Sequence, residues 1–374
     1  MPRIVSVAAA QPEFVLPQSS AREFCRALFG GSHAEIERLL DIFENAQIAE
    51  RRIAAPIDWF MTPRPFAERN ARYIDVALAL SEQAARTALD AAAMTPADID
   101  HIVFVSSTGV ATPSLDARLM NRLAFGSHTR RTPIWGLGCA GGAAGLALAA
   151  ELAGGASVAD GARGATVLLI AVELCSLTFQ AGDLSKSNLV ATALFADGAA
   201  AAVIAPDAHR DRARTANAHT APERQPRVGH TPRIVASRST LFPDTEDVMG
   251  WEVNDAGLKV LFSRDIPTIV RRFVRENAEE FLAEHGLCLA EIDHVVAHPG
   301  GVKVMAAYEE AFGLDARALR HAREVLRVAG NMSSPTVLFV LARLLDDPEV
   351  APGDCGLLTA LGPGFSSELL LLKW

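Results

Sequence analysis

The pattern of apolar and polar positions divides the chain into short apolar strands and longer helices with one apolar face. Amphipathic helices are predicted near Ala71–Ala93 and Pro267–His285, and each is followed by a short apolar strand. The chain opens with an apolar stretch, Met1–Val7, that predicts a first strand. A long alanine-rich helix is expected directly after Cys139, and Asn331 is expected to open another helix. This alternation of strands and helices predicts an α/β fold.

The pattern also occurs twice. Residues Ala97–Val103 and Ala290–Val296 match almost residue for residue at an offset of 193 positions (290 − 97). A repeat of this length indicates two related α/β halves rather than a solenoid of small units. The segment Pro206–Arg233, rich in Arg, His, Pro, Thr and Ala, reads as an exposed linker or surface loop. We therefore expect an N-terminal half, 1–232, and a C-terminal half, 233–374.

The two halves differ at matching positions. Cys139 and Asn331 fall at pseudo-equivalent helix starts, whereas His298 ends a strand in the second half where the first half has Val105. Such unequal residues at equivalent places predict one active site built from both halves. The first half also has extra residues, which we place near Ser176–Val190, where they would wall a pocket or form a subunit contact.

Composition narrows the class of protein. The 374 residues are 50% hydrophobic and 21% charged, as in an ordinary globular enzyme, and the net charge of −9 argues against nucleic acid or an anionic membrane as a partner. No apolar stretch is long enough to span a bilayer, so no stable membrane insertion is expected. The five cysteines are scattered without a CxxC pair, which makes a disulfide framework or a metal site unlikely and favours a reducing, cytoplasmic location.

Three residues carry the candidate chemistry. Cys139 lies at a predicted helix N-terminus, where backbone N–H groups and the helix dipole stabilise a thiolate. It could accept an acyl group as a thioester, and the imidazole of His298 could lower the pKa of the thiol by ion pairing. His298 and the amide of Asn331 could also donate hydrogen bonds to one carbonyl oxygen, which suits an enolate formed by decarboxylation.

Several sequence blocks resemble the signature motifs of the type III polyketide synthases, the chalcone-synthase-like family of the thiolase fold. The blocks occur in the order of the family and run through most of the chain: Gly138–Gly142, Leu194–Ala200, His298–Gly301, Gly330–Ser334 and Gly362–Phe365. Any one of them would be a weak signal, but together they are highly specific.

The resemblance implies a thiolase-like duplicated αβαβα five-layered fold and a homodimer. It implies that Cys139 is the acyl-accepting nucleophile, and that His298 and Asn331 bind the thioester carbonyl and promote decarboxylation of malonyl-CoA. The implied activity is an acyltransferase that repeatedly condenses malonyl-CoA onto an acyl-CoA starter and then cyclises the chain. CoA thioesters are its substrates, and no metal or other cofactor is implied.

The resemblance also assigns pocket residues. Phe195 corresponds to the gatekeeper aromatic at the mouth of the CoA tunnel, and Gly362, Pro363 and Gly364 to the loop that shapes the cyclisation cavity. Other positions depart from the plant pattern: Val260 replaces a second gatekeeper phenylalanine, Cys175 a starter-pocket threonine, Trp251 a glycine, and Thr112 a methionine that reaches the cavity of the partner subunit. Thr178 lies beside Cys175 on the same predicted wall. Val260 would open space at the cavity junction unless Phe262 fills it.

These departures look more like bacterial enzymes that make alkylpyrones or alkylresorcinols from fatty acyl-CoA, and a bulky Trp251 favours a pyrone after few extensions. For the CoA phosphates we expect cationic contacts from Arg51 and Arg52, on a helix resembling the CoA-contacting helix of the family, and from Lys303. The starter length, the number of extensions and the ring type are not fixed by the sequence.

Alternatives to a polyketide synthase remain at this stage. A ketoacyl synthase of type III performs a single condensation with the same Cys, His and Asn, and a non-catalytic acyl-binding protein would release no CO2 from malonyl-CoA. A thiolase is disfavoured because Cys355 lies upstream of the glycine–proline loop, where the second catalytic cysteine would stand. A cysteine hydrolase with a nucleophile elbow is excluded because Leu137 occupies the position of the required glycine.

Overall fold

The computed structural model describes residues 1–374 except 31–35, 156–163, 208–230 and 264. Most of the expected linker, Pro206–Arg233, therefore lies outside the described residues. The strands have these bounds: β1 Pro2–Ala10, β2 Phe14–Pro17, β3 Glu50–Ile53, β4 His101–Val105, β5 Arg130–Ile134, β6 Val167–Leu174, β7 Asp197–Pro206, β8 Arg233–Leu241, β9 Met249–Asn254, β10 Gly257–Phe262, β11 His294–Ala297, β12 Cys355–Gly362 and β13 Ser366–Lys373.

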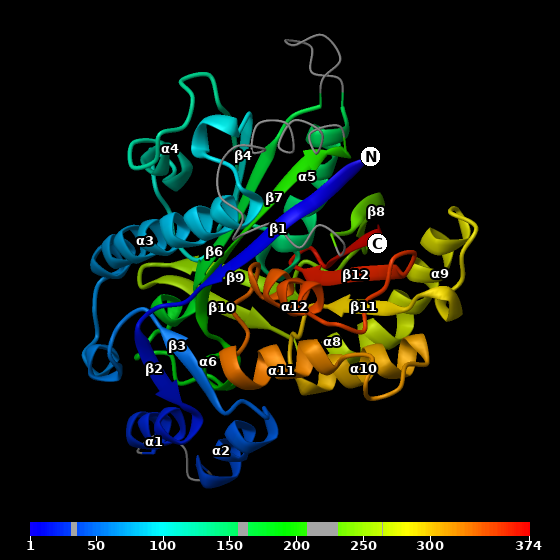
Figure 1. The fold of residues 1–374 in the computed structure, drawn as a ribbon. Helices are drawn as coiled ribbons and strands as arrows, with labels where there is room; N and C mark the ends of the chain where they lie inside the picture. Colours follow the sequence, from blue (N-terminus) through cyan, green and yellow to red (C-terminus); the bar gives the residue numbers. More distant parts are fainter. Residues whose placement is uncertain (31–35, 156–163, 208–230, 264) are drawn as a thin grey trace.

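Helices connect these strands on both faces of the sheet (Figure 1). Their bounds are α1 Gln18–Phe29, α2 Ile36–Asn45, α3 Phe66–Ala92, α4 Leu115–Met120, α5 Gly141–Gly154, α6 Lys186–Leu194, α8 Ile266–Ile269, α9 Arg275–Ala283, α10 Val302–Phe312, α11 Arg320–Ala329 and α12 Thr336–Leu345. Short tight turns of helix are η1 Ile57–Met61, η2 Pro96–Asp98, η3 Gly138–Ala140, η4 Cys175–Thr178, the π turn η6 Val270–Val274, and η7 Leu289–Glu291. The two amphipathic helices predicted from the sequence correspond to α3 and to the continuous helical stretch from α8 to α9.

The sheet displays the internal repeat. Within the described residues, nine strands follow one another in the order β11-β12-β13-β8-β1-β7-β6-β4-β5. Strands β4, β6, β7 and β1 of the first half correspond to β11, β12, β13 and β8 of the second, so the order reverses about the β1–β8 junction. That junction rests on one Cα pairing, Arg3 with Arg233, whereas β1 and β7 pair along most of their length. The sheet is therefore two half-sheets that belong to the two repeats.

Helices α5 and α12 form the layer between the half-sheets. Helix α5 contacts β6 and β7 on one side and β12 and β13 on the other. Apart from the exposed Glu151 near its C-terminal end, its sequence is Gly, Ala and Leu on every face, as a helix packed between two sheets requires. Its glycines allow close packing: a Cβ on Gly142 would lie 2.1 Å from the carbonyl oxygen of Ser334, which precedes α12.

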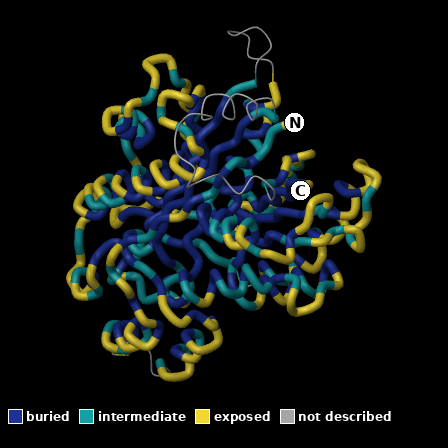
Figure 2. Tube along the Cα trace, viewed as in Figure 1, coloured by how far each residue is buried: buried dark blue, intermediate teal, exposed yellow. Residues whose placement is uncertain are grey.

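The outer layers complete the five-layer arrangement. Helix α3 covers the other face of the N-terminal half-sheet, and α9 packs on β13 of the C-terminal one. Alternate residues of β7 point to different cores, because Ala200 and Ala202 belong to the inner core while Ala199 and Ala201 face α3. The strands are buried and the outer helices carry the exposed positions (Figure 2). The duplicated thiolase-like α/β fold is confirmed.

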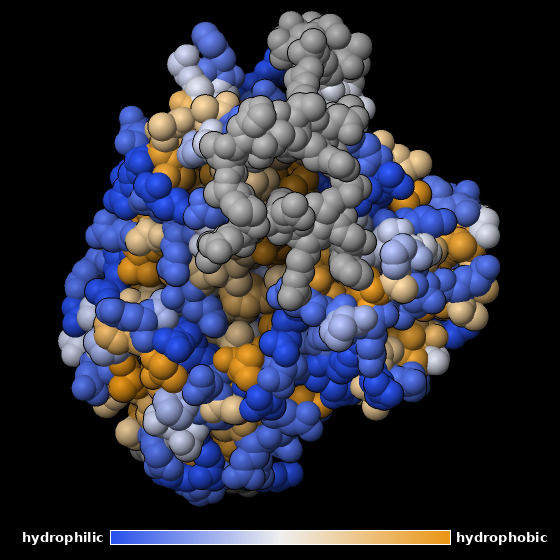
Figure 3. All heavy atoms as spheres, viewed as in Figure 1, coloured by the Kyte–Doolittle hydropathy of each residue, from blue (hydrophilic) through white to orange (hydrophobic). Residues whose placement is uncertain are grey.

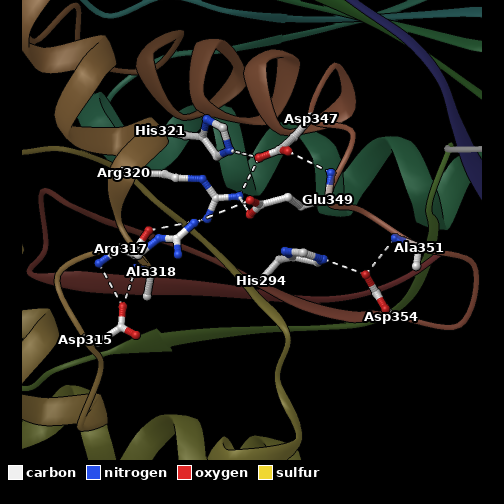
Figure 4. A network of polar contacts seen from close by, with 10 residues as sticks. All are labelled: His294, Asp315, Arg317, Ala318, Arg320, His321, Asp347, Glu349, Ala351 and Asp354. Carbon is white, nitrogen blue, oxygen red and sulfur yellow. Dashed lines mark hydrogen bonds and ion pairs between the residues drawn. The ribbon is translucent and has the colours of Figure 1, made fainter.

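The surface carries scattered polar networks. The face drawn in Figure 3 is mainly hydrophilic with small separate hydrophobic areas. Near β11 and α11, His321 and Arg320 both contact Asp347, and His294 bonds to Asp354 at 2.7 Å (Figure 4). These contacts tie the loops of the C-terminal half together, which agrees with a structural role for His294.

Candidate active site

The nucleophile candidate lies in a tight turn. Cys139 stands in η3, immediately before α5, and its side chain is 5% exposed. Gly138 has a φ of +47°, and a Cβ there would meet the ring of Pro363 at 2.8 Å, so only glycine fits between the turn and the Gly362–Gly364 loop. The predicted position at the start of a helix is confirmed, and the glycine–proline loop lies against the nucleophile turn.

The local structure around Asn331 differs from the prediction. Helix α12 begins at Thr336, so the expectation that Asn331 opens a helix is wrong. Asn331 instead forms an isolated β-bridge with Phe195. Its Oδ1 accepts a hydrogen bond of 2.8 Å from the backbone N–H of Ser333, whose φ of +59° bends the chain back. That bond fixes the orientation of the amide and leaves the NH2 group to donate, and the Asn331 side chain lies near enough to Cys139 to lower the pKa of its thiol.

The histidine comes from the neighbouring strand. His298 directly follows β11, and its backbone N–H donates to the backbone carbonyl oxygen of Thr359 in β12 at 2.9 Å. Strand β12 in turn contacts η3, which carries Cys139. The His298 side chain is 3% exposed, and neither ring nitrogen has a hydrogen-bond partner among the described residues. A buried imidazole with two unpartnered nitrogens is suited to binding a substrate atom.

Burial controls the ionisation of the unliganded site. Burial raises the pKa of the Cys139 thiol to about 11, although hydrogen bonds from Ser333 and Asn331 oppose it. Burial lowers the pKa of His298 to about 3. Both groups are therefore neutral here, unlike the ion pair expected from the sequence. A proton passed from thiol to imidazole would leave the net charge of the site unchanged, whereas either charge alone would be costly.

Sequence reasoning missed a buried carboxyl group beside the nucleophile. Glu173 is the last residue but one of β6. It accepts hydrogen bonds from the backbone N–H of Ser107 and from the hydroxyls of Thr108 and Ser334, at distances of 2.8 to 2.9 Å. Burial raises the pKa of Glu173 to about 7, and these hydrogen bonds oppose the shift. The group joins loops from both halves. An acidic residue inside the apolar run Val167–Leu174 was the signal that could have revealed it.

Four predicted pocket residues line one narrow cavity, here called the inner cavity. It has about 580 Å³ of empty volume, part of which is open to solvent. Its lining includes Phe195, Cys175, Thr178 and Val260, together with Leu16, Phe24, Ile53, Ile57, Phe60 and Phe179. The extra residues of the first half thus wall a pocket, as expected, but α6 occupies part of the stretch predicted as a loop. Phe262 contacts Phe195 edge to face at 6.3 Å, so it fills some of the space left by Val260.

The predicted residues Trp251 and Thr112 lie outside this lining, as does the Gly362–Gly364 loop. Trp251 is half-buried in β9 and pairs directly with Val260 of β10, which puts both side chains on the same face of that hairpin. Thr112 is exposed in the loop before α4. Their contributions to a cavity therefore stay predictions.

The three expected CoA contacts differ in placement. Arg51 and Arg52 lie in strand β3, so the predicted helix is wrong. Arg51 is 1% exposed, and its guanidinium donates to Gln18 and to the carbonyl oxygens of Thr192, Ala193 and Phe195. It therefore caps the C-terminal end of α6 and supports Phe195, so its role in binding CoA phosphates stays a prediction. Arg52 is half-buried and donates to the carbonyl of Glu13, whereas Lys303 is exposed at the start of α10.

Two further features bear on function. In the part of the chain that the structure describes, no cluster of three or more His, Cys, Asp or Glu side chains has the arrangement of a metal site. The same part contains no helix with the length and apolar character needed to cross a bilayer.

Comparison with known proteins agrees with this site. The N-terminal domain of chalcone and stilbene synthases matches residues 58–208, and the C-terminal domain matches 233–374. A putative chalcone synthase of Bacillus subtilis is 43% identical over 99% of this chain and 98% of its own length. A 1,3,6,8-tetrahydroxynaphthalene synthase of Streptomyces peucetius is 39% identical, over 99% of this chain and 93% of that protein.

A solved structure extends the likeness to three dimensions. The crystal structure of 1,3,6,8-tetrahydroxynaphthalene synthase from Streptomyces coelicolor, a bacterial type III polyketide synthase, superimposes with a TM-score of 0.87 at 31% identity, covering 100% of this chain and 99% of the other. This match decides against the single-condensation and non-catalytic alternatives. The chain belongs to the chalcone and stilbene synthase family, and it is a type III polyketide synthase that acts on CoA thioesters by decarboxylative Claisen condensation.

Proposed function

We propose that the enzyme takes a fatty acyl-CoA starter, extends it with malonyl-CoA for a few rounds, and cyclises the chain to an alkylpyrone or alkylresorcinol-type product. The observation that carries this proposal is the inner cavity, whose lining is mainly apolar; Cys139, His298 and Asn331 are not part of that lining. Two lining residues connect it to the site, because Phe195 pairs with Asn331 and Cys175 lies near enough to interact electrostatically with Cys139.

The cavity wall is apolar in effect, although it contains several polar residues. Thr178 donates to the carbonyl of Cys175, Thr192 to that of Asn188, and Asn188 to those of Gln180 and Asp183. Since these groups already have partners, they require nothing from a ligand. The exception among the described lining residues is Arg51, whose buried Nε has no hydrogen-bond partner. Each methylene buried there would contribute about 0.8 kcal/mol, which favours a long acyl chain over a small polar starter.

In the proposed mechanism, the thiol of Cys139 loses its proton to His298 and attacks the starter thioester, releasing CoA. Malonyl-CoA then binds with its thioester carbonyl oxygen between His298 and the NH2 group of Asn331. Loss of CO2 leaves an enolate whose negative oxygen these donors stabilise. The enolate carbon attacks the carbonyl of the Cys139 thioester, the sulfur leaves, and a chain two carbons longer remains on CoA.

Cyclisation and CoA binding complete the proposal. Trp251, on the same face of the β9–β10 hairpin as Val260, limits the space for a folded polyketone, which favours early closure to a pyrone. Lys303, exposed beside the His298–Gly301 loop, contacts CoA phosphates, with Arg52 as a weaker candidate.

We also propose a homodimer formed through the β5 edge of the sheet. Trp135 follows β5 and is 52% exposed, and its indole N–H donates to the carbonyl of Gly109, in the loop that leads to Thr112. An edge strand with an exposed aromatic residue is a typical site of association. Thr112 would then face the partner subunit.

A second candidate follows from the similarity to 1,3,6,8-tetrahydroxynaphthalene synthases of two Streptomyces species. The tetrahydroxynaphthalene synthase similarity suggests a synthase that makes a polyhydroxylated naphthalene, which would require a chain built without a fatty starter. In that case the inner cavity would hold no acyl tail.

Mass spectrometry of products separates the two candidates. The enzyme should be incubated with malonyl-CoA alone and with malonyl-CoA plus acyl-CoA starters of increasing length. Alkylated products that grow with the starter are expected, and none should form with Cys139→Ala. A naphthalene product from malonyl-CoA alone, with no incorporation of fatty starters, would refute the fatty acyl proposal.

A further inference from the structure

The inner cavity ends against a second, open depression, here called the outer cleft. The outer cleft has an empty volume of about 1050 Å³ and is lined by Trp59, Arg64, Asn254 and Lys259 among others. Phe60 and Phe179 line both the inner cavity and the outer cleft. These two rings therefore stand between an apolar interior and a polar surface.

The two rings are held by aromatic neighbours on opposite sides. Phe179 packs edge to face on Phe24 of α1, with ring centroids 5.5 Å apart, and Phe60 packs in the same way on Trp59 at 4.9 Å. Trp59 in turn lies beneath the guanidinium groups of Arg64 and Arg72, at 4.6 and 5.6 Å. Contacts of this geometry add to burial and fix the rings in place. The partition is a packed element rather than a pair of loose side chains.

The outer cleft is a different environment from the inner cavity. Two of its cations pair with carboxylates, Arg64 with Glu68 and Lys259 with Glu252, and a third, Arg69, donates to backbone carbonyl groups. The surface beyond the rings is therefore charged and hydrated. A methylene that fits inside the inner cavity gains about fourfold in binding, whereas one pushed past the rings gains nothing.

We propose that Phe60 and Phe179 form the end wall of the starter cavity and set the longest acyl chain that the enzyme accepts. This inference rests on the proposed fatty acyl starter. Opening the wall would join the inner cavity to the outer cleft, so that the far end of a longer chain passes out to solvent. The two residues act on substrate length, while the acylation chemistry at Cys139 is unaffected.

The test measures acyl loading onto Cys139 by intact-protein mass spectrometry, with saturated acyl-CoA of increasing length in competition. The wild type should load chains up to a limit and then decline steeply. Phe60→Ala and Phe179→Ala should raise loading of chains beyond that limit at least tenfold, and Phe60→Leu and Phe179→Leu should do so less strongly while preserving the packing. Ala191→Leu, which fills the inner cavity from α6, should shorten the limit.

The matched control is Thr62→Ala, an exposed position that lines the outer cleft and not the inner cavity. It should leave the length limit unchanged. If the folded Phe60 and Phe179 variants keep the chain-length limit of the wild type, the proposed end wall is wrong, while the proposed fatty acyl starter still stands. If the wild type loads no fatty acyl chain of any length, both the proposed function and the proposed end wall are wrong. The measurements on the wild type alone show this outcome.

Discussion

Asn331 and Phe195 are joined by a backbone bridge that links the two halves of the chain. The N–H of Asn331 donates to the carbonyl of Leu194 at 3.0 Å, and the N–H of Ala196 donates to the carbonyl of Asn331 at 2.8 Å. The bridge places the amide, which contacts the Cys139 thiol, directly beside the ring that lines the inner cavity. Because these bonds are made by the backbone, substitution of either side chain leaves the bridge intact.

Asn331→Ala should therefore separate chemistry from stability. We expect malonyl-CoA decarboxylation to fall about 10²–10³-fold, because one donor to the developing enolate is lost. The free energy of unfolding should fall by only about 1–3 kcal/mol, since the N–H of Ser333 loses its acceptor. Phe195→Leu is the matched control and should keep decarboxylation while changing starter preference. Release of CO2 by Asn331→Ala at the wild-type rate would contradict the role of the amide.

The ionisation of Cys139 can be tested through His298. Burial raises the pKa of the thiol to about 11, so without a base almost no thiolate exists at pH 7. In His298→Gln we expect alkylation of Cys139 by iodoacetamide at pH 7 to fall at least tenfold, and then to rise about tenfold per pH unit up to about pH 10. Cys175→Ala, which removes a second buried thiol, should behave as the wild type. Equal alkylation rates in His298→Gln and the wild type would show that the imidazole does not assist.

Much of the architecture could be predicted because it follows from periodicity. The repeated segments that contain β4 and β11 are visible as matching apolar runs, and they locate Cys139 and His298 at the ends of buried elements. The run of small and apolar residues after Cys139 predicts a helix packed between other elements, which is α5. These features depend on the spacing of apolar and small residues within short segments, which can be read directly from the sequence.

The features that could not be predicted depend on contacts between distant segments. Arg51 was predicted to contact CoA phosphates, yet its guanidinium is buried and donates hydrogen bonds to carbonyl groups at the end of α6. Asn331 was predicted to open a helix, yet its backbone pairs with the backbone around Phe195, and α12 begins only at Thr336. Glu173 reads only as one charge in an apolar strand until loops from both halves surround it.

Arg51→Met should therefore act on stability rather than on CoA affinity. Removing the guanidinium leaves several buried carbonyl groups without donors, each costing about 1–3 kcal/mol. We expect a loss of at least about 3 kcal/mol in the free energy of unfolding, measured with urea. Lys303→Ala provides the contrast: its stability should be unchanged while KM for malonyl-CoA rises several-fold and becomes less sensitive to salt. A stable Arg51→Met with a raised KM would restore Arg51 to the CoA site.

Glu173 should make stability depend on pH. Its pKa is raised from 4.5 to about 7 in the folded state, so the folded protein binds the proton more tightly than the unfolded chain. The contribution of protonated Glu173 to the free energy of unfolding is fully present below pH 4.5 and is lost as the pH rises through 7. Relative to the wild type, Glu173→Gln should gain on the order of 3 kcal/mol in the free energy of unfolding between pH 4.5 and 8. Asp197, whose pKa burial also raises to about 7, remains as a background in both proteins. Parallel stability curves for the two proteins would contradict the shift.

Trp251 offers the most direct test of product control. Its cross-strand neighbour Val260 lines the inner cavity, so the indole lies on the cavity face of the β9–β10 hairpin. Trp251→Gly should enlarge the space available to the growing chain, and the products should shift toward more extensions or a different ring, as measured by liquid chromatography and mass spectrometry. Trp251→Phe keeps an aromatic ring and should retain the wild-type products, while Val260→Phe, which adds bulk from the opposite strand, should shift them toward fewer extensions. A folded Trp251→Gly with an unchanged product profile would place the indole outside the space where the chain folds.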